Sequence, residues 1–127
     1  MEEGEEFKRL ASQAQKCIDD GHPETLIDTP YPLPLILAAV VFIEKYGSVE
    51  KFNILKHLPN VHVPLLVMIG TEEAQTMMGF RGLPLEVERM AGELDHLTFE
   101  SIPGADHAYT HQREYVWGAV SSWLERV

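Results

Sequence analysis

The sequence predicts an α/β fold in which two parallel strands are flanked by helices and follow a helical N-terminal segment. Residues 65–69 form a continuous apolar run within an expected strand at 64–70, which is typical of a strand buried on both faces of a parallel sheet. A second strand is expected at residues 97–102, and a helical pattern between the two supplies the crossover that parallel strands need. The chain has 127 residues, 45% of them hydrophobic, and is therefore long enough to bury a core.

The first part of the chain is expected to be mainly helical. Apolar residues recur at helical spacing over residues 6–20, and Gly21 is placed to end that helix. Alternating prolines then favour extended backbone over residues 28–34. A second helix is expected over residues 35–46, and its apolar surface would either pack in a core or cover an apolar pocket like a lid. Ser48 can cap a short third helix that runs to about residue 57.

Two more helices complete the second part. Pro84 suits the first turn of a helix that lies between the two strands and ends near Asp95. The closing helix is expected from about Gln112 to Glu125, after the second strand. The order of elements is therefore strand, helix, strand, helix.

Charge and cysteine content narrow the function classes. Twenty acidic residues against ten basic ones give a formal net charge of −10, which disfavours nucleic acid and membrane partners, because both attract a positive face. The longest apolar run, residues 35–43, is far shorter than the roughly 20 residues of a membrane span. Cys17 is alone and the N-terminus is acidic, so we expect no internal disulfide, no secretory signal and a cytoplasmic protein. His107 and His111 are four residues apart, a spacing that could hold a metal ion on one helix, but the loop after Gly104 places His107 before the helix. The other histidines and the glycines lack the spacing of a metal or phosphate site, so no metal and no cofactor is expected.

Acidic and histidine side chains follow the two expected strands. Glu72 and Glu73 come directly after the first strand, and His107 follows the second. In α/β sheets functional groups collect beyond the carboxyl ends of the strands, so a carboxylate and an imidazole can meet there. Glu73 would accept a hydrogen bond from Nδ1–H of His107 and leave Nε2 as a general base, with Glu72 as the competing carboxylate. The positions of these residues in the sequence fit equally well an acidic residue and a histidine that lie in two loops without a common role.

Segments of the second part resemble α/β-hydrolases of the serine hydrolase superfamily, in the correct order. Residues 63–73, VPLLVMIGTEE, are similar to the "vPvLvi-G-x-x-D" passage in which the penultimate strand of that family delivers the triad acid. Residues 102–107, IPGADH, are similar to the "ipGa-x-H" passage that delivers the triad histidine. Residues 52–59 and 114–124 resemble the connector into the penultimate strand and the final helix. The resemblance implies Glu73 as the acid, His107 as the base, and ester or acyl-bond hydrolysis as the ancestral activity.

The resemblance covers residues 48–127 and departs from the family pattern in two respects. The acid is Glu73 where the family usually has Asp, and the nucleophile elbow G-x-S-x-G is absent from the sequence. It therefore implies a partial α/β-hydrolase fold, the C-terminal half of such an enzyme. Residues 1–47 would be a cap- or lid-like segment of this single partial domain, which spans residues 1–127. Without an activated serine, the chain is expected to lack esterase activity of its own.

The expected sheet also predicts partners. Two parallel strands rarely stand alone, so the exposed edge of the strand at 64–70 should pair with a second copy in a homodimer, or with a separate N-terminal hydrolase half. The alternative function, from a different class, is a non-catalytic homodimeric module that binds a small ligand or a protein.

Overall fold

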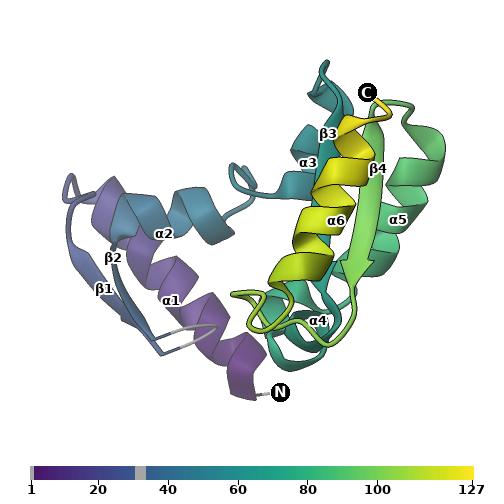
Figure 1. Ribbon diagram of the computed structural model, residues 1–127. Coiled ribbons are helices and arrows are strands. Elements are labelled where there is room, and N and C mark those ends of the chain that lie inside the picture. The colour runs from purple at the N-terminus through teal and green to yellow at the C-terminus, as the bar shows by residue number, and fades with distance from the viewer. Residues whose placement is uncertain (1, 31–33) are drawn as a thin grey trace. The chain divides into compact units, whose positions relative to one another are not determined.

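The computed structural model describes residues 2–30 and 34–127 and groups the chain into two compact units, Met1–Lys56 and His57–Val127. Within the described residues each unit contains one two-stranded sheet with helices packed against it (Figure 1). This mixture of helices and strands confirms the predicted class at a coarse level. Two small sheets do not by themselves define an α/β-hydrolase.

The first unit consists of a helix, a β-hairpin and a second helix. Its elements are α1 (Glu2–Asp19), β1 (Leu26–Thr29), β2 (Leu35–Ala38) and α2 (Ala39–Tyr46). Helix α1 ends at Asp19, and Gly21 terminates it as predicted, with a φ of 83°, a backbone conformation that glycine adopts without steric cost. The N–H groups of Gly21 and His22 donate to the carbonyls of Ile18 and Cys17, so the last turn of the helix is closed by a Schellman motif.

The hairpin corrects the prediction that residues 35–38 belong to the second helix of a mainly helical first part. Strands β1 and β2 pair antiparallel, with Leu26 opposite Ala38 and Thr29 opposite Leu35, so the helix expected over residues 35–46 begins only at Ala39. Ile27 and Thr29 are buried and Leu26 is exposed, because successive side chains of a strand point to opposite faces. Of the predicted proline-rich stretch, residues 31–33 lie outside the described residues.

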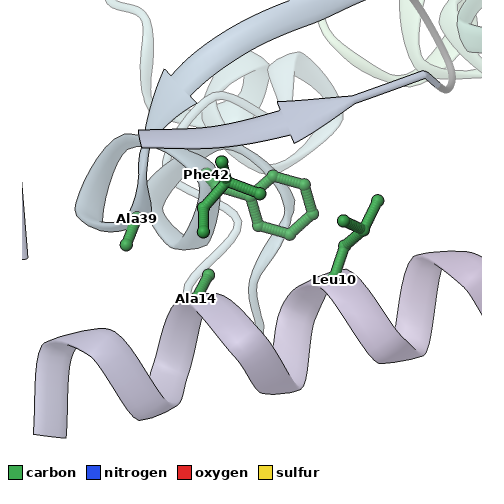
Figure 2. Packing of buried hydrophobic residues seen from close by; sticks show 5 residues of the cluster. Leu10, Ala14, Ala39 and Phe42 are labelled. Carbon is green, nitrogen blue, oxygen red and sulfur yellow. The ribbon is translucent and has the colours of Figure 1, made fainter. Parts of the chain in front are cut away.

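The second helix packs in a core and therefore takes the first of its two predicted roles. Leu10 and Ala14 of α1 face Ala39 and Phe42 of α2 (Figure 2). Buried Ile27 of β1 belongs to the same hydrophobic cluster. Phe42 has no exposed surface, and its ring centroid lies 5.9 Å from that of Phe7 and 5.2 Å from that of Tyr46. Core packing of this kind accounts for the buried face of α2, whereas Val40 and Val41 stay 37% exposed.

The third helix is much shorter than predicted. Of the residues expected to extend from Ser48 to His57, only α3 (Ile54–His57) is helical. Val49 and Phe52 are 62% and 56% exposed, so this segment lacks the buried apolar face that would hold a longer helix against a core.

The second unit contains the two parallel strands that the sequence predicts. Its elements are a 3₁₀ turn η1 (Leu58–Asn60), β3 (Leu65–Gly70), α4 (Thr71–Thr76), a 3₁₀ turn η2 (Met78–Phe80), α5 (Leu83–Glu93), β4 (Leu97–Ile102) and α6 (Arg113–Leu124). Strands β3 and β4 pair in parallel, from Leu65 opposite Leu97 to Gly70 opposite Ile102. Helices α5 and α6 both contact β4 (Figure 1). Among the described residues there is no helix whose length and apolar content would let it cross a membrane.

Replacement of Phe42 tests the core of the first unit. Phe42→Ala removes a fully buried ring and should lower the free energy of unfolding by about 3–5 kcal/mol, because the neighbouring rings cannot fill the cavity. Val41→Ala on the same helix, where the side chain is 37% exposed, should change it by no more than about 0.5 kcal/mol. Urea unfolding followed by far-UV circular dichroism measures both, and equal losses would contradict the packing in Figure 2.

Candidate active site

The parallel register brings the carboxyl ends of β3 and β4 to the same edge of the sheet. Gly70 and Ile102, the last residues of the two strands, are register partners. Helix α4 starts at Thr71 with no residue between it and β3, so Glu73 lies in the first turn of this helix. The loop that leaves β4 carries Ala105 and, two residues later, His107.

The exit loop of β4 lies directly against Gly70. The carbonyl oxygen of Ala105 accepts hydrogen bonds from the backbone N–H groups of Glu72 and Glu73, each 3.1 Å long. A Cβ atom on residue 70 would lie 2.2 Å from that oxygen, so only glycine leaves room for the loop. The backbone N–H of Gly104 donates to Oγ1 of Thr71 over 2.8 Å and holds the loop at a further point.

The structure brings Glu73 and His107 together. Oε1 of Glu73 lies 2.5 Å from Nδ1 of His107, and Oε2 accepts a longer hydrogen bond, 3.4 Å, from the backbone N–H of Gly70. Glu73 is only 3% exposed, so its carboxylate has exchanged water for these donors. The competing carboxylate, Glu72, is exposed and is not the partner of the imidazole.

The two side chains of the pair differ strongly in exposure. The His107 side chain is 68% exposed, whereas that of Glu73 is 4% exposed. Within the described part of the chain, Nε2 of His107 has no hydrogen-bond partner, and the Phe80 ring lies beside the imidazole at 5.7 Å between centroids. One ring nitrogen is therefore held by a buried carboxylate while the other remains accessible. This is the geometry of a histidine that can take a proton from a nucleophile.

The residues around His107 form a tight turn that is organised by Asp106. Oδ1 of Asp106 accepts the backbone N–H groups of Ala108 and Thr110, at 3.0 and 2.9 Å, and its carbonyl accepts that of Tyr109. These hydrogen bonds, first of all that from Thr110, lower the pKa of Asp106 because they stabilise the ionised carboxylate. Asp106 therefore caps this turn.

The outer edge of β3 is partly closed by side chains. The Leu65 N–H donates to the His96 carbonyl, so the odd-numbered residues of β3 point their backbone N–H and carbonyl groups toward β4. The backbone N–H and carbonyl groups of Leu66, Met68 and Gly70 therefore point to the outer edge of the sheet. Glu73 takes the outward N–H of Gly70, and the Tyr109 hydroxyl donates to the outward carbonyl of Met68 over 2.8 Å.

Sequence reasoning missed the supporting residues Thr71, Phe80 and Tyr109. Thr71 and Tyr109 lie within two residues of the site residues in the sequence, and this proximity is a weak signal at best. Their roles follow from contacts that join segments 33 and 41 residues apart, which no local pattern encodes.

Neither a metal site within the described residues nor a similarity to known proteins adds to the geometry of the Glu73–His107 pair. In residues 2–30 and 34–127 no group of three or more histidine, cysteine or acidic side chains is placed to hold a metal ion. Comparison of the chain with models of known families, with curated proteins and with solved structures found no match.

Substitution of Gly70 tests the close approach of the two segments. Gly70→Ala should lower the free energy of unfolding by about 1–3 kcal/mol, because the added methyl group meets backbone atoms that the N–H groups of α4 hold in place. Gly92→Ala is the matched control: nothing lies within 4 Å of its Cβ position, and alanine in α5 should raise stability by up to about 1 kcal/mol. Chemical denaturation measures both. Equal stability of Gly70→Ala and the parent, with unchanged amide signals at Gly104 and Ala105, would contradict the close approach.

Proposed function

We propose that residues 57–127 are the acid- and histidine-bearing part of an α/β-hydrolase that cleaves an ester or related acyl bond. Glu73 acts as the orienting acid and His107 as the general base. The observation that supports this most strongly is the 2.5 Å contact between Oε1 of Glu73 and Nδ1 of His107 at the carboxyl ends of two parallel strands. The two motif-like segments that resemble that family, residues 63–73 and 102–107, are the ones that supply the pair.

The chemistry assigned to the pair follows from the exposure of its two sides. With its proton on Nδ1 and donated to Glu73, the imidazole presents the lone pair of Nε2 to the surroundings. Nε2 would remove the proton of a hydroxyl as that hydroxyl attacks an acyl carbon, and would then protonate the leaving alcohol. The Glu73 carboxylate stabilises the imidazolium that forms between these two steps.

The nucleophile in this proposal comes from another polypeptide segment. The sequence contains no G-x-S-x-G, and in the described residues no hydroxyl or thiol is bonded to Nε2 of His107. A histidine–carboxylate pair without a hydroxyl to deprotonate does not form an acyl-enzyme. The 127-residue chain is therefore proposed to be catalytically incompetent by itself.

The open edge of β3 is where a partner would add. The N–H and the carbonyl of Leu66 and the N–H of Met68 point outward. Within the described residues these three groups have no hydrogen-bond partner. A hydrolase half that carries a serine elbow would cover this edge and complete the site. Pairing with a second copy would cover the edge without supplying a nucleophile, so the homodimer belongs to the alternative proposal, a non-catalytic module that binds a small ligand or a protein.

The first test uses this chain alone. Incubation with a fluorophosphonate probe should give no covalent labelling, and hydrolysis of a short-chain ester should not exceed that of the His107→Ala variant, because no activated serine is present. Mass spectrometry and absorbance measure the two results. Labelling, or turnover well above that of His107→Ala, would contradict the assignment of the nucleophile to another segment.

The second test supplies the missing group. The polypeptide encoded directly upstream of Met1, if it contains G-x-S-x-G, is co-expressed with this chain and treated with the same probe. Serine labelling should appear, should slow at least about a hundredfold with His107→Ala, and should also slow with Glu73→Ala. Glu72→Gln is the matched control and should leave the rate unchanged, because this neighbouring carboxylate is exposed. Absence of an elbow from the upstream frame, or labelling that His107→Ala does not affect, would overturn the proposal.

A further inference from the structure

The Tyr109 side chain joins the loop that carries His107 to the outer edge of β3. Its hydroxyl donates to the carbonyl oxygen of Met68 over 2.8 Å, across 41 residues of sequence. The backbone carbonyl of Met68 points away from β4, so neither strand of this sheet donates a hydrogen bond to it. The backbone of Tyr109 has a φ of 55°, in a region that residues other than glycine seldom occupy. A side chain anchored at its far end is one reason for a residue to keep such a conformation.

His107 lies between two attachment points of one loop. On one side, the Ala105 carbonyl is bonded to the N–H groups at the start of α4; on the other, Tyr109 is bonded to β3. The segment between them is stiff, because Asp106 accepts backbone N–H groups from Ala108, Tyr109 and Thr110. Movement of the Tyr109 ring would therefore be transmitted to His107.

The Tyr109 phenol is suited to a permanent donor role. Partial burial, and to a smaller extent the negative charge of the nearby Glu73 carboxylate, raise the pKa of Tyr109 above its ordinary value. The hydroxyl thus keeps its proton at neutral and mildly alkaline pH. A carbonyl oxygen has two lone pairs, so the hydroxyl can remain on Met68 when a partner strand also bonds to this oxygen.

We propose that Tyr109 is a positioning residue whose hydrogen bond to Met68 holds the imidazole of His107 on the Glu73 carboxylate. This inference rests on the proposed function for its catalytic meaning, but it makes a geometric statement that this chain alone can test. Tyr109 does not touch the reacting atoms; it acts through the turn that contains His107. The residue sets the fraction of molecules in which His107 is correctly placed.

Tyr109→Phe removes the hydroxyl and keeps the ring, and it is compared with Tyr115→Phe, the same change at a 43% exposed position in α6. Loss of the single anchoring hydrogen bond should increase the open population of the loop about fivefold. Amide hydrogen exchange at Ala108 and Thr110 should accelerate by that factor in Tyr109→Phe. The nuclear Overhauser contact between the His107 and Phe80 rings should weaken, while Tyr115→Phe leaves both readouts unchanged.

The other outcomes are also decisive. Unchanged exchange and an unchanged His107–Phe80 contact in Tyr109→Phe would overturn the positioning role, while the serine-labelling test of the proposed function would be unaffected. Equal acceleration of exchange in β3 and β4 would also overturn it, because Tyr109 would then stabilise the whole unit instead of placing His107. Conversely, failure of serine labelling together with the expected loop response would refute the hydrolase proposal and leave the anchoring role in place.

Discussion

The Ala105 carbonyl occupies the space in which a side chain of residue 70 would lie, and the rest of the site depends on this close contact. Because residue 70 is glycine, the exit loop of β4 can reach the first turn of α4 and accept its N–H groups. That contact fixes the distance between two segments that the parallel register has only brought to the same edge. Glu73 lies in the turn that donates these hydrogen bonds, and His107 lies two residues after the accepting carbonyl. One backbone contact therefore positions both side chains.

The second consequence of this arrangement is that the two side chains of the pair differ in their exposure to solvent. A carboxylate that is almost fully buried is costly unless donors replace the lost water, and here the imidazole and the Gly70 N–H do so. The imidazole has the opposite environment, with most of its surface open. Burial of the orienting group and exposure of the proton-accepting nitrogen are what a general base requires, whereas an ion pair that served only stability would not need an accessible Nε2. The hydrolase proposal depends on this division of roles.

The sequence predicted the second unit better than the first, for physical reasons. The apolar run at residues 65–69 predicted a strand, which the parallel pairing of β3 confirms, although residues 65–68 are only half-buried instead of enclosed on both faces. Because the ends of parallel strands lie at one edge, the meeting of Glu73 and His107 could be predicted from the sequence. Residues 35–38 are apolar without a distinguishing period, and the choice between strand and helix was decided by pairing with β1, a contact outside any local window. The hydrogen bond from Tyr109 to Met68 depends on the positive φ of Tyr109 and on the direction of the Met68 carbonyl, and the sequence specifies neither. The catalytic roles remain predictions.

The position of the proton on the neutral His107 ring shows whether Glu73 orients the imidazole as a general base. Long-range ¹H–¹⁵N correlation spectra of this chain distinguish the two tautomers of the imidazole. If the ionised Glu73 carboxylate accepts a hydrogen bond from His107, the spectra will show the proton on Nδ1 and an unprotonated Nε2, and Glu73→Ala will shift the ring toward the Nε2–H form. A predominant Nε2–H form in the unsubstituted chain would contradict the role of His107 as a base, because Nε2 would then have no lone pair that could accept a proton.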